Sequence, residues 1–196
     1  MYHKHTTHAF VLNILPSGEK NNFITLFTRD FGMIKAKAQS VRSIDSKLRY
    51  ALQEYSYVEI SLVKGKDVWR ITNALPINNI YFELKNRQSV FMVIARIFSL
   101  LRRLMPEEGC EAPIFDDVRS ICENAKNIEY TEKSVKVLEW FFVLRLLCSL
   151  GYLHKESFSN LCDPETEWSN EYLDSISSYK DRAIYSINEA LKASHL

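Results

Sequence analysis

The period of the hydrophobic residues changes near Pro76, and this change constrains the fold of the 196-residue chain more than any other feature. Before Pro76 the apolar residues alternate with polar ones, which is the pattern of half-buried β-strands. After Pro76 they recur every three to four residues, which is the pattern of amphipathic helices. The sequence therefore predicts an α+β protein in which a β domain, residues 1–76, precedes a helical domain, residues 77–196.

Five strands are expected before Pro76, separated by turns that are rich in Gly, Asn and Asp. In the third strand, Ile34 and Ala36 share one face while Lys35 and Lys37 share the other, because successive side chains of a strand alternate. Five strands within about 70 residues fit a small five-stranded barrel such as an OB-fold. The expected strands cover residues 8–15, 22–28, 31–39, 52–63 and 68–72.

The later segments show helical patterning, and one of them is apolar on nearly every side. Thr131 is expected to cap this helix and Gly151 to end it, and its composition predicts the central helix of a bundle. It contains Glu139 and Arg145 and is shorter than the roughly 20 apolar residues that cross a bilayer. With no signal-peptide pattern at the N-terminus, the sequence predicts a cytoplasmic protein without a membrane segment. The expected helices cover residues 87–105, 112–127, 131–151 and 178–193.

Charge is distributed unevenly between the two predicted domains. Residues 1–76 contain 11 basic and 6 acidic residues, a net charge of +5, whereas the remaining 120 residues contain 14 basic and 18 acidic ones, a net charge of −4. Five cations lie within the 15 residues 35–49, and the turn Lys64–Gly65–Lys66 adds two more. Such asymmetry indicates an anionic partner for the first domain.

The basic residues have two interpretations. They form either a solvated strand face, with lysines that discourage edge-to-edge aggregation, or a surface that contacts nucleic-acid phosphates. The density of cations favours nucleic acid, and the neighbouring aromatic side chains (Phe31, Tyr50, Tyr55, Tyr57) could stack on bases. Trp69 shares a strand face with Ile71 and is expected in the core instead. The predicted nucleic-acid-binding residues are Lys35, Lys37, Arg42, Lys47, Arg49, Lys64, Lys66 and Arg70.

Metal binding is not favoured. His3, His5 and His8 lie at the chain terminus, and only the first two would share a strand face. The cysteines lack the paired spacing of a structural zinc site and are expected as reduced, packed thiols, with no disulfide framework. They are Cys110, Cys122, Cys148 and Cys162.

No catalytic signature is present in the sequence, so neither an enzymatic activity nor a cofactor is predicted. The chain lacks the phosphate-binding spacing G-x-x-x-x-G-K-[ST] and the signatures G-x-S-x-G and H-E-x-x-H. The acidic pairs Glu107–Glu108 and Asp116–Asp117 lie near predicted helix starts, where the helix dipole accounts for them.

The order of these features resembles the RecO family of bacterial recombination mediators. The resemblance covers residues 8–73, with "LFTRDFG", a basic segment that leads to "SKLRYALQEYS", and "VWRIT". The stretch "LEWFFVLRLLCSLGYL" resembles a helix that is central to the helical domain of that family. Many members place a four-cysteine zinc ribbon after this helix, but only Cys162 stands in that region here, so we predict no zinc.

The resemblance implies a non-catalytic protein of DNA repair and recombination in the RecF pathway. It implies binding to single- and double-stranded DNA, annealing of complementary strands, and recombinase loading together with RecR and the single-strand-binding protein SSB. By position, Lys35, Lys37, Arg42, Lys47 and Arg49 would contact phosphates. Apart from the resemblance, Arg102 and Arg103 of the helical domain are predicted to bind a partner protein. Two alternatives stay open: a protein–protein adaptor with a structural barrel, and an RNA-binding OB-fold factor.

Overall fold

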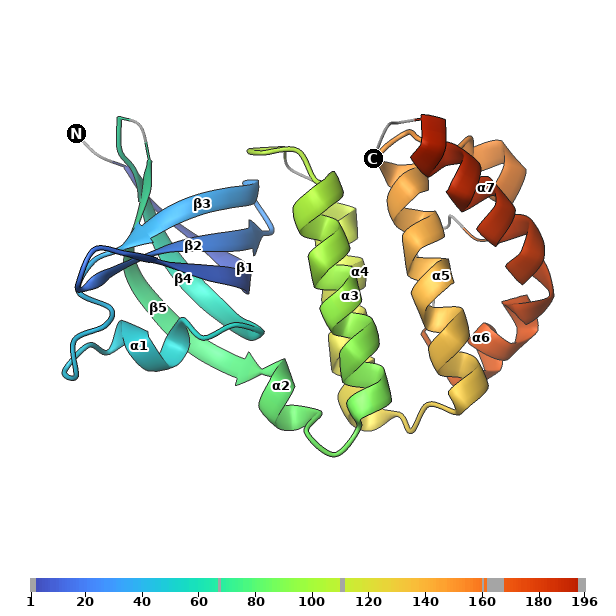
Figure 1. Ribbon diagram of the computed structural model, residues 1–196, viewed down its shortest axis with the longest axis horizontal. Helices are drawn as coiled ribbons and strands as arrows, with labels where there is room; N and C mark the ends of the chain where they lie inside the picture. The colour runs from blue at the N-terminus through green and yellow to red at the C-terminus, as the bar shows by residue number, and fades with distance from the viewer. Residues whose placement is uncertain (1–2, 67, 110–111, 160, 162–167, 194–196) are drawn as a thin grey trace. The chain divides into compact units, whose positions relative to one another are not determined.

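The computed structural model describes residues 3–66, 68–109, 112–159, 161 and 168–193. Five strands form a closed barrel in the order β1-β2-β3-β5-β4, and β4 pairs with β1 to complete the circle (Figure 1). Neighbouring strands are antiparallel except β3 and β5, which run parallel. The predicted α+β class with an N-terminal five-stranded OB-like barrel is confirmed. The strands are β1 (Lys4–Ser17), β2 (Asn21–Thr28), β3 (Gly32–Ala38), β4 (Ser56–Lys64) and β5 (Trp69–Asn79).

The barrel forms because alternate residues of every strand are apolar and point to one interior. In β3, Ile34, Ala36 and Ala38 are buried in this core, whereas Lys35 is exposed on the outer surface. Each large aliphatic side chain buried in this way stabilises the fold by about 1.5–3 kcal/mol. Trp69 belongs to the same core cluster and is 6% exposed, as its shared face with Ile71 predicts.

Three aromatic side chains on the outer surface of the barrel are nevertheless buried. Phe10, Phe27 and Tyr57 lie opposite one another on β1, β2 and β4. Their ring centroids lie 5.2, 5.4 and 6.4 Å from that of Phe115, which is fully buried. Phe115 therefore covers one end of this outer face, although it lies far from the strands in sequence.

The helices follow the predicted pattern closely. Thr131 caps α5 as expected, because its side-chain oxygen accepts a hydrogen bond from the backbone N–H of Ser134. The short helix α6, capped by Ser169, lies outside the ranges in which the sequence predicted helices. The helices are α1 (Leu48–Ala51), α2 (Ile80–Glu83), α3 (Gln88–Leu104), α4 (Ala112–Asn127), α5 (Glu132–Ser149), α6 (Asn170–Ile176) and α7 (Lys180–Ala193), with 3₁₀ turns at Lys155–Phe158 and Ser177–Tyr179.

The chain forms two compact units whose boundaries cut through α3 and α4. The first unit, here called the barrel unit, consists of residues 1–86 and 101–115. The second, the helical unit, consists of residues 87–100 and 116–196. The assignment of residues 1–76 to nucleic-acid binding and 77–196 to partner binding stays a prediction.

A buried ion pair lies in the core of the helical unit. The Arg145 side chain is 6% exposed and donates two hydrogen bonds to Asp117, at 2.9 and 3.0 Å, and one to the carbonyl oxygen of Leu161. Its guanidinium also lies 5.9 and 5.8 Å from the ring centroids of Phe141 and Trp168. Burial raises the pKa of Asp117, and the hydrogen bonds from Arg145 oppose that rise. The dipole interpretation of the pair Asp116–Asp117 is therefore insufficient, because Asp117 holds this buried arginine.

No helix in the described ranges is both long enough and apolar enough to cross a membrane.

Candidate nucleic-acid interface

A row of four side chains crosses the outer surface of the barrel. Leu15 of β1 pairs with Phe23 of β2, Phe23 pairs with Lys37 of β3, and Lys37 pairs with Arg70 of β5. Directly paired residues of neighbouring strands point to the same side of a sheet. Leu15, Phe23 and Arg70 are exposed and Lys37 is partly exposed. We call these residues the outer row: two apolar and two cationic side chains in register.

The pairing that joins Lys37 to Arg70 is not local in sequence. The two residues meet because β3 and β5 run parallel, and parallel neighbours need a long connection between them. Neither Lys37 nor Arg70 forms an ion pair with another residue in the described part of the chain. The structure therefore brings two predicted binding residues together and leaves both cations accessible.

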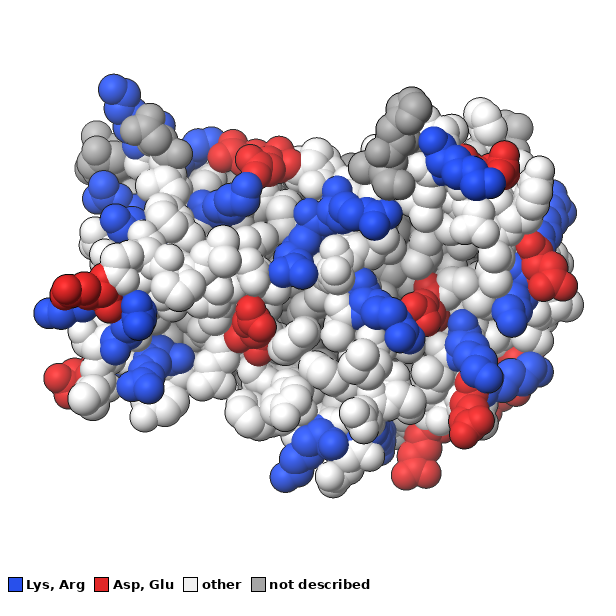
Figure 2. Space-filling view, in the orientation of Figure 1, with Lys and Arg blue, Asp and Glu red and all other residues white. Residues whose placement is uncertain are grey.

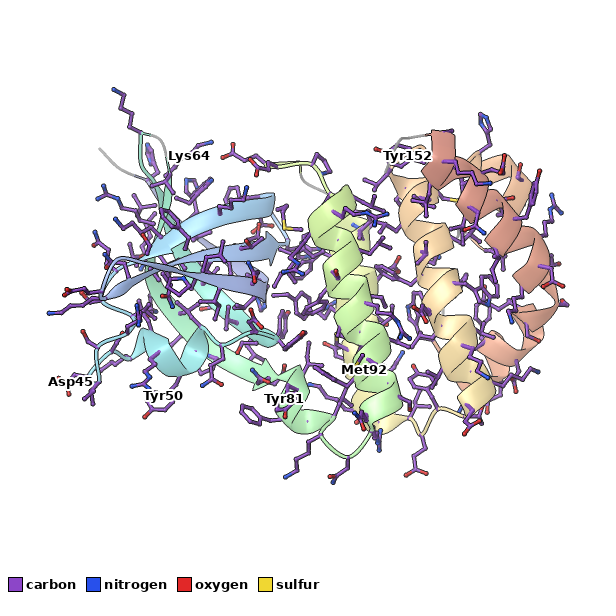
Figure 3. The ribbon with its side chains drawn as sticks, viewed as in Figure 1. Asp45, Tyr50, Lys64, Tyr81, Met92 and Tyr152 are labelled. Carbon is purple, nitrogen blue, oxygen red and sulfur yellow. The ribbon has the colours of Figure 1, made fainter. Side chains whose placement is uncertain are left out.

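The connection between β3 and β4 carries three further predicted residues. Arg42 is exposed, and its guanidinium donates a hydrogen bond of 3.1 Å to the carbonyl oxygen of Gly18. Lys47 and Arg49 are exposed at the start of α1. Figure 3 shows Tyr50, which is 74% exposed, projecting outward from the same helix. Cations and an aromatic ring thus adjoin here, as the sequence analysis expected.

On the face of the barrel that Figure 2 shows, the basic side chains do not form one continuous patch. Where the barrel faces the viewer in Figure 2, the cationic side chains (blue) are separated from one another, and carboxylate side chains (red) lie among them. Lys35, Lys37, Lys64, Lys66 and Arg70 come from three strands and one turn. The barrel fold thus brings together cations that lie far apart in sequence, such as Lys37 and Arg70.

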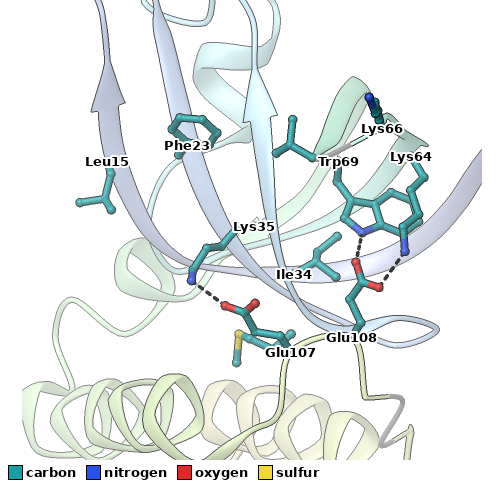
Figure 4. Close-up of a pocket in the computed structure, with 11 residues that line it drawn as sticks. Leu15, Phe23, Ile34, Lys35, Lys64, Lys66, Trp69, Glu107 and Glu108 are labelled. Carbon is teal, nitrogen blue, oxygen red and sulfur yellow. Dashed lines mark hydrogen bonds and ion pairs between the residues drawn. The ribbon is translucent and has the colours of Figure 1, made fainter.

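A groove of about 710 Å³ lies beside the outer row (Figure 4). Its lining combines apolar side chains with three lysines, which are Lys35 of β3, Lys64 of β4 and Lys66 of the β4–β5 turn. Leu15 and Phe23 of the outer row belong to the same lining. Apolar surface next to cations is the combination that holds nucleic-acid bases and phosphates together.

Two acidic residues also line this groove, and the sequence analysis missed their role. Glu107 forms an ion pair of 2.6 Å with Lys35, and Glu108 forms one of 2.7 Å with Lys64. Glu108 also accepts a hydrogen bond of 3.0 Å from the indole N–H of Trp69. The dipole interpretation of this pair is wrong, because both carboxylates contact the barrel. No local signal could reveal contacts across 72 and 44 residues of sequence.

Two of the aromatic residues that were expected to stack on bases, Tyr57 and Phe31, contact other side chains of the barrel instead. Tyr57 is buried, and its hydroxyl lies 2.9 Å from Nδ1 of His8. Phe31 contacts His5 and Trp69, with ring centroids 5.2 and 5.0 Å apart. The exposed ring beside the cations of the outer row is that of Phe23, which the sequence analysis did not single out.

Two of the terminal histidines are explained by these contacts, since His5 packs on aromatic rings and His8 bonds a tyrosine. In the described part of the chain, no three His, Cys, Asp or Glu side chains gather closely enough to hold a metal ion. Cys122 and Cys148 are buried. Cys110 and Cys162 lie outside the described residues. The absence of zinc stays a prediction.

The predicted partner-binding residues lie at the end of α3. Arg102 and Arg103 are exposed in its last turn. Cations at this position also interact favourably with the helix dipole. Neither residue lines the groove, and their role in partner binding stays a prediction.

Comparison with known proteins shows which family the chain resembles. The family model "Recombination protein O N terminal" matches residues 1–80, which include the whole barrel sheet. The barrel region of this chain is therefore similar to the N-terminal domain of RecO proteins. It is 29% identical to the DNA repair protein RecO of Dehalococcoides mccartyi strain BAV1 over 150 residues, which are 76% of this chain and 57% of that protein.

The chain is also similar to a second RecO protein, over a region of comparable length. The DNA repair protein RecO of Thermodesulfovibrio yellowstonii is 24% identical over 163 residues, which are 82% of this chain and 63% of that protein. The chain thus spans less than two thirds of the length of both RecO relatives. The match extends well beyond the barrel, since it is longer than the 80 residues that the family model covers.

Proposed function

We propose that this protein is a non-catalytic DNA-binding mediator of recombinational DNA repair, acting in the cytoplasm. It binds single- and double-stranded DNA, promotes strand annealing, and loads recombinase together with RecR and SSB. The match of residues 1–80 to the family model of the RecO N-terminal domain, and the names of the similar proteins, DNA repair protein RecO, support this proposal. The outer row supplies the structural basis for DNA binding.

The observation that carries the proposal is the register of Phe23, Lys37 and Arg70. Lysine and arginine side chains bind phosphates through charge-assisted hydrogen bonds, which position the strand without reading its sequence. An exposed aromatic ring one strand away offers a face on which an unpaired base can stack. A DNA strand whose phosphates lie along β3 and β5 and whose base lies over Phe23 would make both the phosphate contacts and the stacking contact.

The first test removes the two cations of the outer row. Four phosphate contacts to a single strand predict a slope of about −3 for log K against log salt, and each lost contact flattens it by about 0.7. The variant Lys37→Ala/Arg70→Ala should therefore bind more weakly, with a slope flatter by about 1.4. Fluorescence anisotropy with single-stranded DNA, duplex DNA and single-stranded RNA of equal length measures both quantities.

The matched control for this test is Lys85→Ala/Lys180→Ala, which removes two exposed cations that lie outside the outer row and the groove lining. It should keep the parental slope. If Lys37→Ala/Arg70→Ala bound DNA with unchanged affinity and slope, the two cations would be part of a solvated strand face that does not contact DNA. Preferential binding to RNA would favour the RNA-binding alternative.

The second test concerns base stacking on Phe23, which is 38% exposed. Replacing Phe23 with Leu keeps an apolar side chain but removes the aromatic face. Stacking is worth about 1–3 kcal/mol per base, so affinity for single-stranded DNA should fall by roughly 5- to 150-fold. Duplex binding should change little, because paired bases are already stacked. Phe82→Leu, at an exposed ring of α2, is the control, and an equal loss on duplex would refute stacking at Phe23.

A further inference from the structure

The segment that follows α3, residues 105–109, lies on the barrel and is here called the acidic segment. Glu107 forms a parallel bridge with Met33, and the backbone N–H of Glu108 donates a hydrogen bond of 2.9 Å to the carbonyl oxygen of Met33. Gly32 and Gly109 approach so closely that a Cβ at Gly32 would lie 1.7 Å from the carbonyl oxygen of Gly109. The sequence thus provides a glycine at each side of this contact.

The two carboxylates of the acidic segment form ion pairs with lysines that line the groove (Figure 4). Glu107 bonds Lys35, and Glu108 bonds both Lys64 and the indole N–H of Trp69. The hydrogen bond from Lys64, followed by that from Trp69, lowers the pKa of Glu108. Glu108 therefore presents negative charge to the groove.

Glu108 adopts a conformation that its residue type disfavours. Its φ angle is +56°, in the left-handed region that costs a non-glycine residue of order 1 kcal/mol or more. Such conformations persist where surrounding contacts hold them. Here the contacts are those with Met33, Lys64 and Trp69, so the strain accompanies the placement of the carboxylate in the groove.

The same lysines cannot serve a carboxylate and a phosphate fully at the same time. A carboxylate oxygen accepts the same charge-assisted hydrogen bond from Lys that a phosphate oxygen accepts. A phosphate entering beside Glu107 and Glu108 would also meet two like charges. The side chains of the Lys35–Glu107 pair are 66% and 70% exposed, and exposed pairs of this kind are individually weak. The acidic segment can therefore compete with DNA and still be displaced by it.

We propose that Glu107 and Glu108 are an internal competitor for the DNA groove, so that DNA must displace their carboxylates from Lys35 and Lys64 to bind there. This inference rests on the proposed DNA-binding function and specifies how that site is regulated. It implies that the barrel binds short or weakly charged ligands poorly. A DNA strand succeeds because several phosphates act together and outcompete two carboxylates.

The test is Glu107→Gln/Glu108→Gln, which removes both charges and preserves the size of the side chains. The control Glu59→Gln/Glu83→Gln removes two charges from the barrel unit outside the groove lining. At 50 mM salt, the first variant should bind single-stranded DNA about tenfold more tightly than the parent, and the control less than about twofold more tightly. The advantage should shrink as salt rises, because salt screens exposed ion pairs.

A measurement on the unmodified chain complements the variants. The indole N–H signal of Trp69 in a ¹H–¹⁵N spectrum, assigned with Trp69→Phe, reports its hydrogen bond to Glu108. Titration with single-stranded DNA should move this signal as the carboxylate leaves. A stationary signal, or equal affinities of both glutamine variants, would overturn the competitor role while the Lys37→Ala/Arg70→Ala result still supports DNA binding. Failure of parent and Glu107→Gln/Glu108→Gln alike to bind DNA would overturn both proposals.

Discussion

Replacing Phe115 with Ala is expected to lower the free energy of unfolding of the barrel unit by about 3–5 kcal/mol, as for other fully buried phenylalanines. Phe115 is fully buried against Phe10, Phe27 and Tyr57. Its removal leaves a cavity over three aromatic rings on the outer surface of β1, β2 and β4. Urea denaturation followed by circular dichroism measures the change.

The control for this prediction is Phe82→Ala, because Phe82 is an exposed phenylalanine of the same unit. Its loss should change stability by about 0.5 kcal/mol or less. The same contacts predict that a fragment of residues 1–76 lacks the native stability of the barrel. If Phe115→Ala were as stable as the parent, or that fragment folded with undiminished stability, residues 101–115 would not be integral to the barrel unit.

Replacing Arg145 with Met is expected to destabilise the helical unit by about 3–5 kcal/mol, because it leaves the carboxylate of Asp117 buried without its partner. For a chain of this length, each kcal/mol lowers the melting temperature by roughly 2–4 °C. Differential scanning calorimetry should therefore show a fall of the order of 10 °C. The loss should shrink as pH falls toward 4: burial raises the pKa of Asp117, so protonation relieves the unpaired charge.

Two further variants separate the buried pair from charge removal in general. Arg96→Met breaks the more exposed pair with Glu139 and should cost about 1 kcal/mol or less. Asp117→Leu/Arg145→Met replaces both members of the buried pair by apolar side chains and should recover much of the stability. If Arg96→Met and Arg145→Met lowered the stability equally, burial of the Arg145–Asp117 pair would not account for the effect of Arg145→Met.

Local sequence pattern predicted the elements well because their causes are local. The alternation of Ile34, Lys35 and Ala36 follows from the pleat of a strand, whatever its neighbours are. Thr131 caps α5 with its own side chain, three residues from the N–H that it binds. The four-residue helices α1 and α2 and the seven-residue α6 were not predicted, because elements of one or two turns carry too few residues to show a period.

The candidate site was only partly predictable. Lys37 and Arg70 were identified as cations from composition, but their pairing depends on the parallel alignment of β3 and β5. Phe23 looked like an ordinary strand residue, and its place beside Lys37 follows from the β2–β3 register. The roles of Glu107 and Glu108 required a contact between the barrel and a segment beyond α3.

The amino-acid sequence alone is sufficient to predict which faces of the strands and helices are apolar, where the chain changes from β to α, and which part of it is basic. Those properties arise from side-chain chemistry and from the fixed periods of the two kinds of backbone. By contrast, the contacts of Phe115 with the outer face of the barrel, and the ion pairs of Glu107 and Glu108 with Lys35 and Lys64, arise from the folded arrangement of the chain. Contacts between residues tens of positions apart depend on how the strands close and the chain returns, and no local period encodes that path.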